Sequence, residues 1–407
     1  MQKALFLGYV WPEPKTTAAG HRMVQLLESF IANGYEITFA TTAQETSYSE
    51  KLLDLNIKTQ KILLNDATFD DFVGSLNPDV VVFDRFMVEE QFGWRVAQFA
   101  PNALRILNTE DLHSLRSIRQ ACIKANEAFT NAKWLKEDIT KREIASIYRS
   151  DLTLMISQVE TQLLQSVFGI TESLLLTLPF LLDTISKEAQ AQWPAFEDRQ
   201  DFIFIGNGKH APNVDAVKYL KADIWPLVRK ELPNVKLNIY GAYLPQQITE
   251  IHEPKDGFLV HGWGEDLNTV MQNAKINLAP LRFGAGLKGK VVDGMQNGTP
   301  TITTAVGAEG IPEFKAYENP KEFSIAAINS YNNKAEWLKM QKAGVAIINK
   351  HFAKQNLAFQ LFKTITSLKN TLAKHRSHNF IGSLLQHQTM ASTKFMGKWI
   401  EEKNTKR

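Results

Sequence analysis

The sequence predicts an α/β protein with two doubly wound parallel-sheet domains that face a central cleft. Three observations support this prediction. Short apolar runs typical of strands alternate with longer stretches of helical periodicity, the alternation occurs twice along the 407 residues, and a polar segment separates the two series. Alternating strands and helices are typical of parallel sheets covered on both faces, so each half is expected to be Rossmann-like.

The first series covers residues 1–182, which we expect to form the N-terminal domain. Its clearest helix spans residues 20–33, where apolar side chains recur at the spacing that marks one helix face. These side chains are Met23, Leu26, Leu27, Phe30 and Ile31. A second helix is expected at 158–167. Strands are expected at 4–7, 36–40, 80–83, 105–108 and 152–157.

The second series covers residues 201–365 and predicts the C-terminal domain. Segment 183–200, rich in Glu, Gln and Ala and containing Pro194, is interpreted as the linker, and 366–407 as a basic helical tail. Strands are expected at 202–205, 235–240, 258–260, 276–281 and 301–304. Helices are expected at 213–220, 266–273, 290–297 and 335–348.

Composition excludes several classes of protein. Apolar residues make up 44% of the chain and charged residues 22%, which is typical of globular proteins and not of disordered or fibrous ones. The single cysteine, Cys122, excludes an intrachain disulfide and a multi-cysteine metal site. The apolar run at the start is too short for a signal peptide, and no stretch reaches the roughly 18 apolar residues of a membrane span. We therefore expect a cytoplasmic protein.

Positive charge is concentrated in the tail. The net charge is +3, but residues 370–407 hold seven Lys or Arg and two acidic residues, a balance of +5 that leaves −2 for the rest. This excess is too local for a nucleic-acid-binding enzyme. The tail is either a helical end, solvated or packed back on the N-terminal domain, or a peripheral contact with the inner face of the membrane. The apolar residues for such a contact are Phe380, Ile381, Leu384, Leu385, Phe395, Trp399 and Ile400.

The strongest signal for a ligand site lies in residues 279–298, where a predicted strand leads into a glycine-rich turn and the turn into a helix. Glycines let the backbone approach a ligand closely, and the N–H groups that begin a helix suit phosphate. Asp293, about one turn into the helix, is placed to accept hydrogen bonds from ribose hydroxyls. The glycines are Gly284, Gly286 and Gly289, and the cations are Arg282, Lys288 and Lys290. The alternative is a tight turn with solvent-facing lysines.

Three other segments follow predicted strands. Residues 206–213 form a second glycine-rich turn, residues 8–22 form a long loop shaped by two prolines, and residues 108–116 gather ionisable groups. Those groups are Glu110, Asp111, His113 and Arg116, which together offer an acid, a base and hydrogen-bond donors. Because ligands of open α/β sheets sit beyond the carboxyl ends of the strands, we expect all three segments at the cleft.

Several catalytic motifs are absent from the sequence. There is no Asp-x-Asp triplet, no His-Glu-x-x-His helix motif, no Gly-x-Ser-x-Gly elbow and no P-loop. The first absence argues against a metal-bridged diphosphate site. The last makes P-loop nucleotide hydrolysis an unfavourable hypothesis.

Taken together, these segments resemble the group 1, family 4-type nucleotide-sugar glycosyltransferases of the two-domain GT-B architecture. The resemblance covers most of residues 1–365 and is carried by 204–216, 260–267 and 280–311, and more loosely by 8–22, 110–116 and 157–160. It implies transfer of a sugar from a nucleotide diphosphate to a glycan, lipid-linked or other hydroxyl acceptor in cell-surface polysaccharide or glycoconjugate synthesis. It also implies retention of anomeric configuration and no metal or other cofactor.

The resemblance implies a role for each segment. The catalytic residues would be His113, Asp111 and Lys288. The N-terminal loop would face the acceptor through Thr17, Gly20 and Arg22. The donor would be bound by Gly206, Asn207, Gly208, Lys209, Trp263, Arg282, Gly286, Leu287, Gly289, Lys290, Asp293 and Glu309.

The chain departs from the family pattern at a pair of acidic positions. Many relatives carry two glutamates eight residues apart, whereas here Ala285 stands at the first position and Asp293 at the second. Aspartate is one methylene shorter, so the ribose contact must move or weaken. Glu309, in the next strand-end loop, is the candidate substitute for the missing first carboxylate.

Two other functions stay open at this stage. A nicotinamide-dependent oxidoreductase would use the turn at Gly206 or the one at Gly284, whose Gly-x-Gly-x-x-Gly pattern matches a dinucleotide fingerprint. That fingerprint should follow the first strand of its domain, whereas Gly284 follows about the fourth. A catalytically degenerate relative would bind nucleotide or glycan without turnover, and Ala285 is the residue that favours it.

Overall fold

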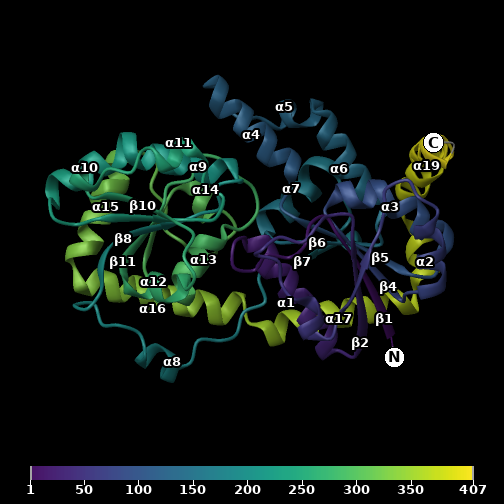
Figure 1. Ribbon diagram of the computed structural model, residues 1–407, viewed down its shortest axis with the longest axis horizontal. Coiled ribbons are helices and arrows are strands. Elements are labelled where there is room, and N and C mark those ends of the chain that lie inside the picture. The colour runs from purple at the N-terminus through teal and green to yellow at the C-terminus, as the bar shows by residue number, and fades with distance from the viewer. Residues whose placement is uncertain (1, 406–407) are drawn as a thin grey trace.

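The computed structural model describes residues 2–405 and contains two parallel sheets in two α/β lobes that lie side by side (Figure 1). The predicted fold class is confirmed. Two large apolar clusters pack against the first sheet and two smaller ones against the second, so both sheets are covered on both faces. Strands buried in this way are almost continuously apolar, which is why they were visible in the sequence.

The first sheet has seven strands, all parallel, in the order β3-β2-β1-β4-β5-β6-β7. The central strands were predicted, but the two edge strands were not. β3 is polar and exposed, so it carries no apolar signal, and β7 is only three residues long. The strands are β1 (Gln2–Gly8), β2 (Tyr35–Thr41), β3 (Lys58–Lys61), β4 (Val80–Asp84), β5 (Leu104–Glu110), β6 (Leu152–Met155) and β7 (Leu175–Thr177).

Helices connect these strands, and α1 (Ala18–Ala32) is the predicted first helix. Its buried face carries Met23, Leu26, Leu27 and Phe30, as the periodicity indicated, whereas Ile31, expected on the same face, is exposed. Asn33 ends it as the C-cap. The other helices are α2 (Thr68–Leu76), α3 (Phe86–Phe99), α4 (His113–Ala125), α5 (Asn131–Lys136), α6 (Asp138–Arg149) and α7 (Gln158–Phe168).

The second sheet has five parallel strands in the order β10-β9-β8-β11-β12. The order reverses beside β8, the first strand of this domain, as in a doubly wound sheet. The strands are β8 (Gln200–Ile205), β9 (Leu237–Tyr240), β10 (Phe258–Gly262), β11 (Ala274–Ala279) and β12 (Thr301–Thr303). The helices are α9 (Ala211–Tyr219), α10 (Trp225–Glu231), α11 (Gln246–Thr249), α12 (Leu267–Asn273), α13 (Gly289–Gln296), α14 (Ala305–Ala308), α15 (Pro320–Asn332) and α16 (Lys334–His351).

The chain crosses between the lobes twice. The first crossing is the predicted linker, which holds the short helix α8 (Lys187–Ala191). At the second, the backbones of Leu182 and Ala353 form a parallel bridge. Residues 354–365, which the sequence assigned to the C-terminal domain, therefore begin α17 (Lys354–Asn370) and pack on the N-terminal domain. There the ring of Phe362 lies 5.0 Å from that of Phe30.

The tail continues from α17 into α18 (Leu372–His378) and α19 (Phe380–Thr405). These yellow helices run along the N-terminal lobe, and α19 lies against α3 and α6 (Figure 1). The tail thus packs back on the first domain, as one interpretation of the sequence expected. None of the helices within residues 2–405 combines the length and the apolarity needed to cross a membrane.

Candidate functional site

The glycine-rich turn between β11 and α13 lies directly against the end of β5 in the other domain. The N–H of Gly286 donates a hydrogen bond of 2.8 Å to Oε1 of Glu160. Gly286 has a φ of +64°, and a Cβ there would lie 2.8 Å from the Cβ of Asp111. Only glycine fits this position without strain, both for its backbone angle and for its space. The contact brings the predicted donor turn and the predicted catalytic segment together.

His113 and Asp111 form a pair at the start of α4. Nε2 of His113 lies 3.5 Å from Oδ1 of Asp111, and Arg116 donates a short hydrogen bond to the same carboxylate. Burial alone would raise the pKa of Asp111, but Arg116 and His113 outweigh it and lower that pKa. Burial lowers the pKa of His113 to about 4. At neutral pH the site therefore holds a carboxylate beside an uncharged imidazole, which can accept or donate a hydrogen bond.

Glu143 positions the histidine, and sequence reasoning missed it. Its carboxylate accepts the N–H groups of His113, at 2.8 Å, and of Ser114, at 3.0 Å, so it satisfies the first donors of α4. It also accepts the Ser114 hydroxyl at 2.6 Å. Burial raises the pKa of Glu143 to about 7. Glu143 lies on α6, far from His113 in sequence, so no local pattern identifies it.

Glu160, in the first turn of α7, is the second acidic residue that received no role. Its Oε1 also accepts the N–H of Leu112 at 3.1 Å, so one oxygen joins both domains. Burial and the nearby charge of Asp111 raise the pKa of Glu160 to about 8. A signal was available, because Glu160 closely follows the end of β6, where ligands of parallel sheets bind.

Two predicted cations begin α13 and are almost fully buried. Lys288 is the N-cap residue, and its Nζ donates to the carbonyl oxygens of Ala285, at 3.0 Å, and of Gly286. Lys290 donates to Oδ1 of Asn213, and its Nζ lies 4.4 Å from the centre of the Phe204 ring. Burial lowers the pKa of both lysines, that of Lys290 to about 7.

The predicted ribose ligand, Asp293, lies one turn further along α13. Burial raises its pKa to about 7, and the charge of Lys290 opposes this shift. Leu287, beside the cations, is buried in an apolar cluster that includes Val291 and Ile156. A Cβ on Gly289 would lie 2.5 Å from the Cβ of Ala18, so the start of α13 also touches the N-terminal loop.

Glu309 is placed beside the turn by a residue that the sequence did not suggest. Nη1 of Arg119, on α4, lies 2.8 Å from Oε2 of Glu309 and donates to the carbonyl oxygen of Gly284, also at 2.8 Å. Arg282, in contrast, is part of a surface ion pair with Asp215 at 2.5 Å. Arg282 is exposed, whereas Lys288 and Lys290 are buried, so the three cations of the turn do not share one environment.

The turn after β8 reaches the N-terminal loop. A Cβ on Gly208 would lie 2.2 Å from the carbonyl oxygen of Tyr243, so this position needs glycine. Asn207 donates to the carbonyl oxygen of Thr16 at 3.3 Å. Nζ of Lys209 lies 3.4 Å from the centre of the Tyr243 ring. A Cβ on the preceding Gly206 would crowd Asn213 at 2.8 Å.

Trp263 follows β10 and is partly exposed. Its ring centre lies 5.2 Å from that of Tyr48 in the first domain. Tyr48 in turn contacts Tyr243, and the Tyr243 hydroxyl donates to Glu13 at 3.1 Å. Aromatic side chains from both domains therefore meet beside the turn after β8.

The N-terminal loop residues mainly build the loop itself. Thr17 caps α1 by accepting the N–H of Gly20 at 2.9 Å, and a Cβ on Gly20 would overlap the backbone of Glu13 at 2.6 Å. Arg22 is fully buried, where it pairs with Glu110 at 3.0 Å and donates to the carbonyl oxygen of Leu178. The expected acceptor role of this loop stays a prediction.

Among the residues that the structure describes, no three His, Cys, Asp or Glu side chains lie close enough together to hold an ion.

Sequence comparison finds similarity mainly in the second domain. Residues 199–333 match the family model described as Glycosyl transferases group 1. A curated relative, an uncharacterized 44.6 kDa protein in the cps region of Klebsiella pneumoniae, is 27% identical over 115 residues. That match covers 26% of this chain and 30% of the relative, so it spans less than a third of either protein.

Solved structures share the whole two-domain fold. Sucrose-phosphate synthase from Thermosynechococcus elongatus has a TM-score of 0.66 at 16% identity over 90% of this chain and 99% of its own. Anabaena HepE in complex with UDP and glucose has a TM-score of 0.65 at 12% identity, and the match covers 90% of this chain and 100% of HepE. WaaG, a glycosyltransferase of lipopolysaccharide biosynthesis, has a TM-score of 0.61 at 12% identity, and the match covers 89% of this chain and 99% of WaaG. The chain therefore has the two-domain GT-B fold, and its residues 199–333 match the group 1 glycosyltransferase family model.

Proposed function

We propose that the protein transfers a sugar from a nucleoside-diphosphate sugar to a glycan, lipid-linked or other hydroxyl acceptor in cell-surface polysaccharide or glycoconjugate synthesis. The group 1 domain supports the class of reaction. The Klebsiella relative lies in a cps region, and HepE was solved with UDP-glucose, which together support the pathway class and the type of donor. We place the enzyme on the cytoplasmic side of a membrane.

The proposal rests on the closeness of the start of α13 to the His113–Asp111 pair. The start of α13, with Lys288 and Lys290, lies across the domain junction from the His113–Asp111 pair, and Gly286 makes the direct contact. A diphosphate at the helix start would place its sugar toward that pair. The leaving diphosphate gains negative charge as the glycosidic bond breaks, so fixed cations and helix N–H groups stabilise the transition state more than the ground state.

The lowered pKa of Lys290 fits this role. A buried amine near neutrality is only partly charged, and an incoming diphosphate would restore the full charge. Asp293 would bond the ribose, and uncharged His113 would hold a hydroxyl of the sugar or the acceptor. We propose that these lysines make a metal unnecessary and that the configuration is retained, which the anomeric coupling of the product would test.

The first experiment is thermal unfolding with UDP, GDP, ADP, CMP, NAD and NADP, each with and without EDTA. A nucleotide at about 100 times its Kd stabilises a protein by roughly 2.7 kcal/mol. We expect one nucleoside diphosphate to raise Tm equally with and without EDTA. Because Lys288→Ala and Asp293→Ala remove diphosphate and ribose contacts, both should abolish that shift.

Other outcomes of this panel contradict the proposal. Stabilisation by NAD or NADP alone indicates the oxidoreductase. A nucleoside-diphosphate shift that EDTA removes contradicts metal independence. A shift without transfer to any acceptor indicates the degenerate relative.

A further inference from the structure

Helix α19 presents an apolar face to solvent. Six large apolar side chains on it are between 47% and 73% exposed, and all of them except Met396 lie on one face. At 3.6 residues per turn, the five positions of this face fall within about 100° of the helix circumference. A surface helix normally buries such a stripe against the core of its own protein. Because this face is exposed, we expect it to bind something other than residues 2–405. The five residues of this face are Phe380, Ile381, Leu384, Phe395 and Trp399.

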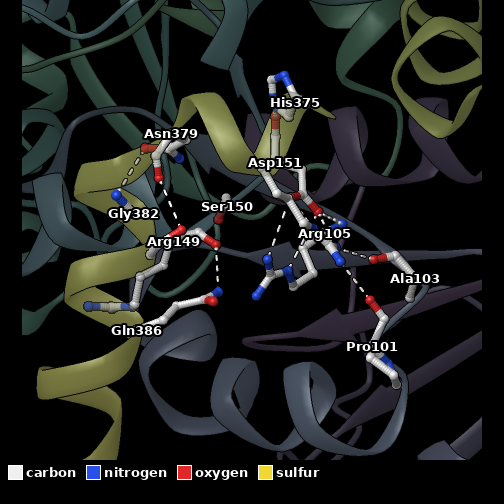
Figure 2. Close-up of polar contacts among 12 residues, drawn as sticks. Pro101, Ala103, Arg105, Arg149, Ser150, Asp151, His375, Asn379, Gly382 and Gln386 are labelled. Carbon is white, nitrogen blue, oxygen red and sulfur yellow. Dashed lines mark hydrogen bonds and ion pairs between the residues drawn. The ribbon is translucent and has the colours of Figure 1, made fainter. Parts of the chain in front are cut away.

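The opposite face of α19 docks on the N-terminal domain through small and polar residues. A Cβ on Gly382 would overlap the carbonyl oxygen of Tyr148 at 2.1 Å, and one on Gly397 would lie 3.0 Å from Asn65. Gln386 donates to the carbonyl oxygen of Arg149 at 3.3 Å (Figure 2). The two glycines allow close approach, so α19 uses its polar side for the domain and leaves its apolar side outward.

An ion pair holds this orientation at the preceding helix. Arg376 on α18 donates to both oxygens of buried Asp151, at 2.8 and 2.7 Å, and to the carbonyl oxygens of Pro101 and Ala103. His375 contacts the carbonyl oxygen of Asp151 at 2.8 Å, and Figure 2 shows these contacts around Asp151 and Arg105. To bury its apolar face, α19 would have to rotate against this anchor.

The charge around the apolar face is complementary to anionic lipid. Lys398 and Lys403 are exposed at its edges, and Lys394 is half-buried beside them. Nζ of Lys403 lies 5.2 Å from the centre of the Trp399 ring. The face also holds Glu402, so lysines outnumber acidic residues there. Tryptophan beside lysine on an apolar helix face is typical of helices that lie in a membrane interface.

We propose that α19 docks the protein on an anionic lipid surface, with its apolar face in the headgroup layer and its polar face on the N-terminal domain. This inference deepens the proposed function, on which it rests, by naming the surface where a lipid-linked acceptor would be met. Docking itself needs no nucleotide and is measured without one.

The test is co-sedimentation of the full chain with phosphatidylcholine vesicles, with and without phosphatidylglycerol. We expect binding to the anionic vesicles that weakens with salt. Phe395→Ser with Trp399→Ser should weaken it at least about tenfold, because two large apolar groups leave the interface. Lys394→Gln, Lys398→Gln and Lys403→Gln should each weaken it about five-fold. Phe359→Ser, a similarly exposed position on α17, is the matched control and should bind like the wild type.

Thermal unfolding and the nucleotide response of each variant show that it folds. If Lys288→Ala loses nucleotide stabilisation but still binds vesicles, the docking inference stands and the two proposals are separated. Absence of wild-type binding to anionic vesicles overturns the inference. So does self-association that the Phe395 and Trp399 changes abolish without any vesicle binding, because the occupant is then a second copy of the chain.

Discussion

Glu160 lies where the two domains touch, and its environment decides its charge. Oε1 accepts N–H groups from Leu112 in one domain and Gly286 in the other. Oε2 is buried and has no hydrogen-bond partner among the described residues. Burial raises the pKa of the carboxyl to about 8 from an ordinary value of 4.5. Glu160 is therefore mostly protonated at neutral pH, which removes the cost of a buried charge at the domain junction.

This pKa shift predicts a pH dependence of stability. The folded state binds the proton more tightly than the unfolded state, so the stabilisation is full below about pH 4.5 and is lost as the pH rises through about 8. We expect the Tm of the wild type to fall between these values. In Glu160→Gln the fall should be shallower, because an amide keeps an acceptor oxygen and cannot ionise. Glu143 titrates in both proteins, so the difference between the two curves isolates Glu160, and parallel curves would contradict the assignment.

At the scale of elements, the turn between β11 and α13 is built around close backbone contacts. Gly286 combines a positive φ with contacts to Asp111 and Ile156 in the other domain. Gly34, after α1, also has a positive φ of +79° but has open space where its Cβ would be. Comparing substitutions at these two positions therefore distinguishes the free-energy cost of a left-handed backbone angle from the cost of steric crowding.

Alanine at these two positions should therefore have different effects. Gly34→Ala should cost about 1 kcal/mol of unfolding free energy, the price of an L residue in the left-handed region. Gly286→Ala should cost about 1–3 kcal/mol more, because its methyl group overlaps Asp111. Denaturant titration of both variants measures this difference. Equal costs would show that the turn does not pack against the first domain in solution.

At the scale of the molecule, a few polar contacts join the domains around the site. Besides Glu160 and Gly286, they include Arg119 with Glu309 and Tyr243 with Glu13. Each contact joins a segment that follows a strand of one sheet to a segment that follows a strand of the other, and Arg119 and Glu160 lie on the helices α4 and α7. Domain closure of this kind excludes water from a transfer reaction and limits hydrolysis of the donor.

Removing one of these contacts should loosen the closure. Arg119→Ala deletes the ion pair with Glu309 and the bond to Gly284, which together are worth about 1.5–3 kcal/mol. We expect a larger radius of gyration by small-angle X-ray scattering and a faster release of bound nucleotide. Arg142→Ala is the control, because Arg142 pairs with Glu90 inside the first domain. An unchanged radius in both variants would contradict a role for Arg119 in closure.

Sequence alone determined the alternating architecture, the first helix, the central strands and the glycine turn at Gly284–Gly289. It also placed His113 and Asp111 at a strand end and marked the apolar residues of the tail. Each of these is a local signal, because periodicity and glycine spacing depend on neighbours along the chain. The exposed edge strand β3 lacks such a signal and was missed.

Only the tertiary structure decided which residues meet across the domains. Glu143 and Arg119 contact residues 30 and 190 positions away, and no local pattern identifies such partners. The sequence assigned Arg22 to the acceptor and residues 354–365 to the C-terminal domain. In the structure Arg22 is buried and pairs with Glu110, and the start of α17 packs on the first domain. The pKa values of Glu160 and Lys290 follow from the same cause. Segments that are distant in the sequence bury these side chains, and this burial determines both their contacts and their pKa values. Neither the contacts nor the pKa shifts exist until the two domains are assembled.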